Sequence, residues 1–193
     1  MSGTMMENLP SSDRTVVLTG FMACGKSTFG RAAAEILGWQ FVDLDKRIEE
    51  SYGPIPAIFS RGGEPLFREI ESGILESVLK ESKGKSCLVA LGGGTVLSDR
   101  NMEILRGNGA FIIWLDTSFD IILSELGNAK RPLVQNKSEE EIRALYNARR
   151  ERYATCADSV VRIESADYAK AVNDITTISE AHQRRHAAGS PLP

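Results

Sequence analysis

The sequence predicts an α/β protein of the doubly wound kind, a parallel sheet with helices on both faces. Short apolar and β-branched runs alternate along the chain with longer amphipathic runs. Most of the short runs lack strict alternation of polar and apolar residues, which is typical of strands buried on both faces. Right-handed crossovers between such strands place helices on each side of the sheet. The strands are expected at 15–19, 40–43, 87–91, 110–115 and 159–163.

The longer runs predict the helices and one domain. The first strand stops at Gly20, and apolar residues then recur at helical spacing until Gly38. Helices are expected at 27–37, 44–51, 63–82, 99–107, 118–126, 138–155 and 168–185. The polar segment 127–137 contains Gly and Pro and is expected to be a mobile loop. We therefore expect a single domain over 14–180, between a disordered lead-in (1–13) and a polar C-terminal tail (181–193).

Composition excludes several classes of function. With 193 residues the chain has room for one domain, and its net charge of −3 provides no basic field for nucleic acid or an anionic membrane. His182 and His186 lie in the polar tail, which argues against a histidine-based triad or zinc site. Cys24, Cys87 and Cys156 are odd in number and far apart, which fits no disulfide framework. The chain also shows no signal peptide and no apolar run of the roughly 18 residues that a membrane span needs, so the cytoplasm is the expected location.

The strongest motif is GFMACGKS at 20–27, which matches GxxxxGK[ST]. It begins where a strand ends and runs into a helix, so that backbone N–H groups and the helix dipole face a phosphate. Lys26 would reach the β- and γ-phosphates of ATP, and the Ser27 hydroxyl would bind Mg²⁺. The nucleotide-binding residues are expected to be Gly20, Ala23, Cys24, Gly25, Lys26, Ser27 and Thr28. The alternative, a glycine-rich turn with a solvated lysine, is disfavoured by the flanking strand and helix.

Three further segments carry candidate site residues. Asp43 and Asp45 follow the second strand, where one carboxylate could face a metal and the other a substrate hydroxyl, although an aspartate there could equally cap a helix. Arg68 and Glu71 share a helix face, for which an exposed ion pair is the default interpretation. The glycines at 92–94 follow the third strand, and they either allow the backbone to approach a ligand closely or form a flexible turn.

Together these segments resemble a known family. GFMACGKST, DLD, FREIE, LGGG, KRPL and RRERYATCAD occur in the order and at the intervals found in shikimate kinases, from about Thr15 to Ile163. The resemblance implies a monomeric P-loop kinase of the nucleoside-monophosphate-kinase type, with a five-stranded parallel sheet in the order 2-3-1-4-5 and a lid near 127–137. It also implies Mg²⁺-dependent transfer of the γ-phosphoryl group of ATP to the 3-hydroxyl of shikimate.

The resemblance also implies roles for single residues. Asp45 would orient or deprotonate the attacking hydroxyl, and Arg68 and Arg149 would bind the shikimate carboxylate through guanidinium forks that a lysine cannot imitate. Gly93 would contact the substrate through its backbone. Arg131 would act as the lid arginine, catalytic with Lys26 and Asp45 and in contact with the nucleotide. In addition, Asp43 would lie near the Mg²⁺ ion and Glu71 would hold the first arginine in place.

The sequence departs from the family pattern at two places. An arginine that stacks on adenine in the family is missing from the Leu123–Leu126 window, around Ser124. Ala23 and Cys24 stand where the family prefers glycine and a small residue, and Cys24 is expected to be an accessible thiol near the phosphate. Two alternatives remain at this point: another hydroxy-acid kinase, such as gluconate kinase, or a catalytically silent regulator that binds nucleotide or shikimate. No nucleic-acid or membrane partner is expected.

Overall fold

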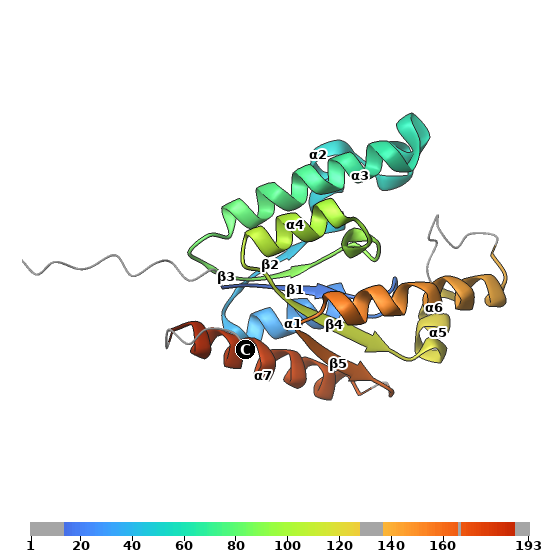
Figure 1. The fold of residues 1–193 in the computed structure, drawn as a ribbon. Coiled ribbons are helices and arrows are strands. Elements are labelled where there is room, and N and C mark those ends of the chain that lie inside the picture. Colours follow the sequence, from blue (N-terminus) through green and yellow to red (C-terminus); the bar gives the residue numbers. More distant parts are fainter. Residues whose placement is uncertain (1–13, 128–136, 166, 188–193) are drawn as a thin grey trace, which may run out of the picture.

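The computed structural model describes residues 14–127, 137–165 and 167–187 (Figure 1). Within these ranges, five parallel strands form one sheet in the order β2-β3-β1-β4-β5. The α/β class and the strand order expected from the sequence are therefore confirmed. The strands are β1 (Arg14–Thr19), β2 (Gln40–Asp43), β3 (Ser86–Ala90), β4 (Phe111–Thr117) and β5 (Ser159–Ile163).

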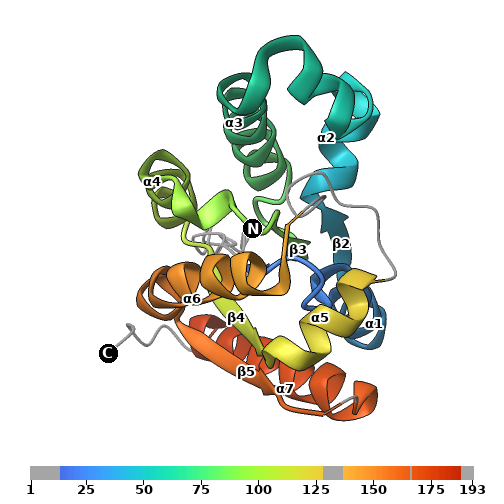
Figure 2. The same ribbon diagram turned by 90° about the vertical axis from the view of Figure 1, so that its right-hand side faces the viewer.

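Helices cover both faces of the sheet. In the end-on view, α1 and α7 lie together on one side, and α4 and α6 lie on the other (Figure 2). The described helices are α1 (Lys26–Leu37), α2 (Leu44–Tyr52), α3 (Ile55–Glu81), the short 3₁₀ helix η1 (Thr95–Leu97), α4 (Asp99–Gly107), α5 (Phe119–Gly127), α6 (Glu139–Cys156) and α7 (Tyr168–Ala187). These bounds agree with most of the expected ones to within two residues.

The burial of the central strand, β1, explains why its apolar run predicted a strand. β1 pairs with β3 on one side and β4 on the other, so that Val16 lies opposite both Leu88 and Phe111. Val16, Val17 and Leu18 are all completely buried. A strand covered on both faces has no solvent side, and this is why its apolar run is continuous.

Helix α3 was only partly predicted. It begins at Ile55, eight residues before the expected start at residue 63, and it is kinked at Gly63, whose φ of 66° and ψ of −164° are not helical. Pro65 restarts the helix beyond the kink, because its fixed φ suits a first helical turn and it needs no backbone donor there. The rings of Phe59 and Phe67, 5.0 Å apart, pack the two segments together. The glycines and prolines of this region are typical of a loop, so the sequence did not predict the helical segment before Gly63.

The C-terminal helix is longer than expected. α7 continues to Ala187, so the tail does not begin at residue 181. His182 is 4% exposed, and its ring stacks on Phe111 with centroids 4.1 Å apart. The prediction that His182 belongs to a polar tail outside the domain is therefore wrong, because its ring packs against Phe111 of β4. The expected lead-in, 1–13, lies outside the described residues.

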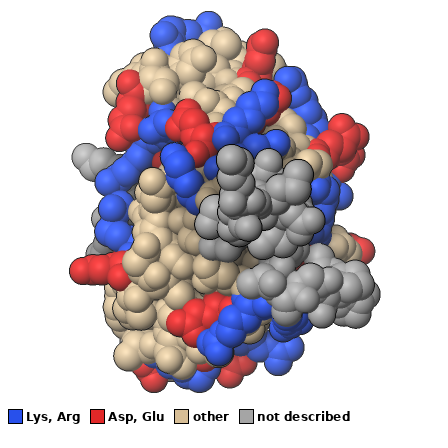
Figure 3. Space-filling view, turned by 90° about the vertical axis from the view of Figure 1, so that its left-hand side faces the viewer, with Lys and Arg blue, Asp and Glu red and all other residues tan. Residues whose placement is uncertain are grey.

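The carboxyl ends of the strands meet at one edge, on the right of Figure 1, where the loop after β1, the start of α2 and the glycines after β3 come together. At the opposite end, shown in Figure 3, Lys and Arg side chains are interspersed with Asp and Glu. No helix in the described ranges has the length and apolar character that crossing a membrane requires.

Candidate active site

The loop after β1 forms a cradle that is closed by its own lysine. Lys26 is 8% exposed, and its Nζ donates to the carbonyl oxygens of Gly20 and Phe21 at 3.0 and 2.8 Å. Ser27 and Thr28 are exposed in the first turn of α1, where the helix dipole is positive. This is the geometry of a phosphate-binding loop: a bound phosphate would give the lysine stronger acceptors than neutral carbonyl groups.

The loop also contains a strained residue. Ala23 has a φ of 60°, a left-handed conformation that costs a residue with a Cβ roughly 1–2 kcal/mol. Glycine would adopt this conformation without that cost, so the alanine at this position is strained.

Cys24 is a packing residue of the loop. It is 2% exposed, its carbonyl oxygen accepts a hydrogen bond of 3.1 Å from Thr117 Oγ1, and its Sγ lies 3.6 Å from Lys26 Nζ. The expectation of an accessible thiol is wrong, because β4 and the loop enclose the side chain.

Gly92 marks the place where two acidic side chains meet. A Cβ at Gly92 would lie 2.9 Å from Asp45 Oδ1, 3.0 Å from Glu71 Oε1 and 3.1 Å from Thr95 Oγ1. The carboxylates of α2 and α3 therefore approach one another around a residue that has no side chain. The absence of a side chain at Gly92 is therefore required by packing within the protein, and the approach of a ligand to these glycines stays a prediction.

Gly93 and Gly94 lie close to two other parts of the site. A Cβ at Gly93 would lie 3.1 Å from the backbone nitrogen of Met22 in the phosphate-binding loop. A Cβ at Gly94 would lie 2.6 Å from Nη2 of Arg68. The three glycines thus bring the aspartate of α2, the phosphate-binding loop and the arginine of α3 to one short stretch of backbone.

Arg68 is held by two carboxylates of its own helix. Its Nη1 donates to Glu71 Oε2 at 2.9 Å, and its Nη2 and Nε donate to Glu64 Oε1 at 3.0 and 3.2 Å. Burial opposes the charge of the guanidinium, but these two carboxylates raise the pKa of Arg68 above its ordinary value. The arginine is therefore fully charged and already paired.

The partner Glu71 is a buried charge. It is 0% exposed and accepts from Thr95 Oγ1 at 2.7 Å and, at 3.4 Å, from Asn101 Nδ2. Ser72 Oγ in turn lies 2.6 Å from Asn101 Oδ1. The cation and the two neutral donors offset the cost of burying this carboxylate. The default interpretation of Arg68 and Glu71 as an exposed ion pair is wrong, and sequence reasoning missed Thr95 and Asn101 because nothing in their spacing marks them.

Helix α6 carries the second arginine. It begins with a capping box in which Ser138 Oγ accepts from Glu141 N at 3.2 Å and Glu141 Oε2 accepts from Ser138 N at 2.7 Å. Arg149 lies half-buried with its guanidinium carbon 5.7 Å from the centre of the Phe21 ring. Its Nη1 is buried and has no hydrogen-bond partner among the described residues. A buried guanidinium nitrogen needs an acceptor, which bound water or an anionic ligand can provide.

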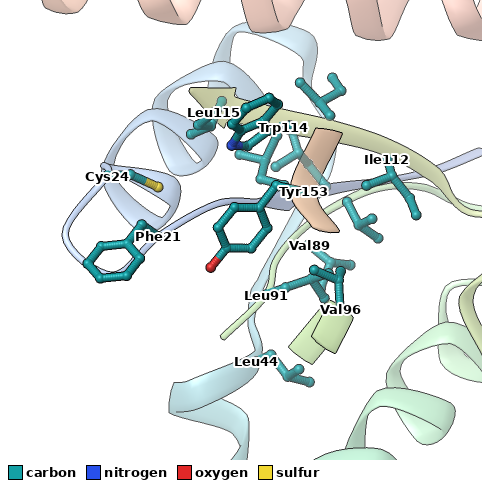
Figure 4. Packing of buried hydrophobic residues seen from close by; sticks show 14 of the residues in the cluster. Phe21, Cys24, Leu44, Val89, Leu91, Val96, Ile112, Trp114, Leu115 and Tyr153 are labelled. Carbon is teal, nitrogen blue, oxygen red and sulfur yellow. The ribbon is translucent and has the colours of Figure 1, made fainter. Parts of the chain in front are cut away.

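Tyr153 lies one turn further along α6. Its hydroxyl donates to the carbonyl oxygen of Gly93 at 2.5 Å, and its ring centre is 6.1 Å from that of Trp114. Figure 4 shows the hydroxyl group directed away from Trp114, towards the side of Phe21. Burial raises the pKa of Tyr153 above its ordinary value.

The two aspartates after β2 differ in their surroundings. Asp43 caps α2, because its Oδ1 accepts from the backbone nitrogen of Lys46 at 3.2 Å, as the capping alternative anticipated. Asp45 lies half-buried in the first turn, beside Gly92. In the described part of the chain, no group of three or more His, Cys, Asp or Glu side chains is placed to hold a metal ion.

A cavity of about 230 Å³ adjoins the phosphate-binding loop. Ile121, Ile163 and Tyr168 are among the residues that line it. Tyr168 is 47% exposed and packs on Phe29, with ring centres 5.4 Å apart. Sequence reasoning did not identify this aromatic residue, although its position just after β5 was a signal. Arg131 and nearly all of the expected lid, residues 128–136, lie outside the described residues.

A phosphate-binding loop between β1 and α1, in a parallel sheet of this strand order, defines the class of the protein as a P-loop kinase. A sequence profile of the shikimate kinases matches residues 22–179. The chain belongs to the shikimate kinase family.

Similar proteins of known name agree with this assignment. A shikimate kinase of Geobacter sulfurreducens is 42% identical over 189 residues, covering 96% of this chain and 99% of that protein. One of Moorella thermoacetica is 38% identical over 162 residues, covering 83% of this chain and 91% of that protein.

Solved structures show the same fold. Shikimate kinase from Acinetobacter baumannii, in complex with shikimate, has a TM-score of 0.79 and 29% identity, covering 92% of this chain and 96% of that one. A gluconokinase from Sinorhizobium meliloti has a TM-score of 0.56 at 14% identity, a likeness that concerns the fold alone. The comparisons favour the shikimate kinase assignment over gluconate kinase.

Proposed function

We propose that this chain transfers the γ-phosphoryl group of ATP to the 3-hydroxyl of shikimate, giving shikimate 3-phosphate and ADP. The family match and the relatives support the reaction. The observation in the site that carries the proposal is the buried Nη1 of Arg149, which lacks an acceptor among the described residues. A substrate carboxylate would provide that acceptor.

In this proposal, the substrate lies against the glycines after β3. Arg68 and Arg149 bind its carboxylate, since a guanidinium group presents paired N–H donors that match a carboxylate. Gly93 contacts the substrate through its backbone, and Tyr153 holds that backbone in place. Asp45, which lies beside Gly92, accepts a hydrogen bond from the reacting hydroxyl. These contacts would fix the position and orientation of a hydroxy acid.

The nucleotide would occupy the loop after β1. Its phosphates would accept from the backbone N–H groups of that loop and from Lys26, which would exchange the carbonyl oxygens of Gly20 and Phe21 for phosphate oxygens. The exposed hydroxyl of Ser27 and the carboxylate of Asp43 are oxygen donors of the kind that Mg²⁺ prefers, with Asp43 acting through a water shell. Mg²⁺ bound with the nucleotide supplies positive charge near the transferring group.

The base of the nucleotide would lie in the cavity beside the loop. Its lining includes Phe29, Ile121, Ile163 and Tyr168, whose apolar surfaces would face a planar ring. An aromatic side chain can stack on a base. This would compensate for the missing arginine near Ser124.

The chemical step needs positioning and charge more than covalent participation by the protein. The oxygen of the 3-hydroxyl forms a bond to the γ-phosphorus, its proton passes to Asp45, and the bond from the γ-phosphorus to the β–γ bridging oxygen breaks as ADP leaves. Lys26 would stabilise the charge that develops on the phosphoryl oxygens. Arg131 is proposed to assist from the lid.

The test is a coupled assay of ADP release over a panel of hydroxy acids that includes shikimate and gluconate. We expect release with shikimate and little with gluconate. Failure to consume ATP with shikimate would refute the proposal and would favour a silent regulator. We also propose that the enzyme is a cytoplasmic monomer, for which size-exclusion chromatography at working concentration is the check on the oligomeric state.

A further inference from the structure

We propose that Glu64 is a built-in competitor for the substrate carboxylate, one that occupies the side of Arg68 that an incoming acid needs. The inference rests on the proposed function, because it takes Arg68 as part of the carboxylate site. It assigns to Glu64 a role in setting affinity and selectivity for acids that the reaction itself does not require.

Every guanidinium nitrogen of Arg68 already has a carboxylate partner. Glu71 accepts from Nη1, and a single oxygen of Glu64, Oε1, accepts from both Nε and Nη2. A carboxylate from a ligand can therefore form paired hydrogen bonds with the Nε and Nη2 edge of Arg68 after Glu64 has left it.

The two glutamates differ in how easily they can leave. The side chain of Glu71 is 0% exposed and is fixed by Thr95, whereas that of Glu64 is 58% exposed and uses one oxygen. Glu64 also follows directly after the kink at Gly63, so that its backbone belongs to the junction of two helical segments. Glu71 is therefore the permanent anchor of Arg68, and Glu64 is the exchangeable partner.

The second arginine differs at one nitrogen. Nη1 of Arg149 is buried and has no hydrogen-bond partner in the described ranges, while each guanidinium nitrogen of Arg68 has a carboxylate partner. An incoming carboxylate gains a new ion pair at Arg149 and replaces an existing one at Arg68. At Arg68, an acid replaces the negative charge of Glu64 with its own. A neutral ligand that displaced Glu64 would leave Arg68 without that negative charge. Glu64 therefore favours acids over neutral alcohols, and it also weakens the binding of the acid.

The sign of the effect distinguishes a competitor from a residue that orients Arg68. Removing a competitor strengthens substrate binding, whereas removing an orienting residue weakens it. Exposed ion pairs contribute little, which corresponds to a change of about two- to fivefold in a dissociation constant. The competitor acts before the chemical step, so kcat is expected to change by less than about twofold.

The experiment compares wild type with Glu64→Gln by calorimetric titration of shikimate and by steady-state kinetics. A matched control is Glu76→Gln, which removes the same charge from another exposed i, i+4 pair of α3, that with Lys80. We expect shikimate to bind Glu64→Gln about two- to fivefold more tightly, with the KM for ATP unchanged, and to bind Glu76→Gln as it binds wild type. Glu64→Ala, which removes any hydrogen bond that glutamine keeps, should also bind more tightly.

Weaker binding in both Glu64 variants would overturn the inference and make Glu64 an orienting residue. Unchanged binding in both would overturn it by showing that Glu64 does not compete for the site. Tighter binding in Glu76→Gln as well would overturn it in favour of a general effect of net charge. If wild type neither binds shikimate nor releases ADP with it, the proposed function fails first and this inference fails with it. A wild type that turns over shikimate normally separates the two outcomes.

Discussion

The hydroxyl of Tyr153 donates a hydrogen bond of 2.5 Å to the carbonyl oxygen of Gly93. Tyr153 follows Arg149 by four residues on α6, so both side chains lie on the same face of the helix. The bond therefore links the helix that carries one arginine to the backbone stretch that meets the other. The helix that carries Arg149 and the glycines beside Arg68 are therefore held together.

Removing this hydroxyl should affect the substrate site more than the nucleotide site. In Tyr153→Phe, the buried ring is kept but the Gly93 carbonyl loses a donor, which costs about 1–3 kcal/mol of stability. We expect the KM for shikimate to rise several-fold and that for ATP to change little. Urea denaturation and steady-state kinetics measure the two effects. Equal changes in both KM values would argue against a local role.

The same residue predicts a dependence of stability on alkaline pH. Burial raises the folded-state pKa of Tyr153, so the native state favours the protonated phenol. This contribution is complete below the pKa of about 10 of an unfolded tyrosine and is lost as the pH rises above that value. The free energy of unfolding of wild type should therefore fall more steeply above pH ~10 than that of Tyr153→Phe. Parallel curves for the two proteins would contradict this explanation.

The glycines after β3 predict a graded response to alanine. In Gly94→Ala, the new Cβ would lie 2.6 Å from Nη2 of Arg68, so the guanidinium must shift against its pair with Glu71. We expect a higher KM for shikimate and a smaller loss of stability than in Gly92→Ala. In Gly92→Ala, the new Cβ meets Asp45 and the buried carboxylate of Glu71, so we expect a loss of both kcat and stability.

Gly73→Ala is the matched control for both variants. Its Cβ would meet nothing within 4 Å, and alanine in a helix should stabilise α3 by about 0.5–1 kcal/mol. Thermal melts and kinetics of the three variants test the order. Normal kinetics in Gly92→Ala would show that the close approach of Asp45 and Glu71 has no functional importance.

Ala23 predicts a stabilising substitution inside the active site. Its φ of 60° is unfavourable for alanine and easy for glycine, so Ala23→Gly should relieve strain. Glycine loses more entropy on folding, which offsets part of the gain, and we expect a net stabilisation of up to about 1 kcal/mol. Equilibrium denaturation measures this difference. A clear loss of stability would show that the loop gains more from a stiffer residue than it loses through strain.

The sequence predicted the sheet well because its strands are buried on both faces. Val16, Val17 and Leu18 form a continuous apolar run that only a covered strand tolerates. The first part of α3 was missed because Gly62, Gly63 and Pro65 look like a loop, whereas the structure uses them as a kink between helical segments. His182 was misplaced for a related reason, since its stacking on Phe111 is a tertiary contact that no local pattern reveals.

The sequence indicated candidate residues for the site but not the contacts between them. Spacing indicated Arg68 and Glu71, but it could not show that Glu71 is completely buried or that Thr95 and Asn101 donate to it. These contacts join α3 to η1 and α4, far apart in the sequence. The sequence did not indicate Glu64 as a site residue, because exposed glutamates are common on helices.

The remaining prediction concerns the proton of the reacting hydroxyl. Asp45→Asn keeps the shape of the side chain beside Gly92 but removes the negative charge that would accept the proton. We expect kcat to fall by about 100-fold or more, since a positioned base contributes roughly 10²–10⁴. The KM for ATP should stay within about twofold, because the phosphate-binding loop is unchanged. Glu50→Gln, an exposed change on the same helix, is the matched control and should behave as wild type. Substantial turnover by Asp45→Asn would mean that the hydroxyl loses its proton directly to the transferring phosphoryl group or to water, and the carboxylate would then be left with a role in orientation alone.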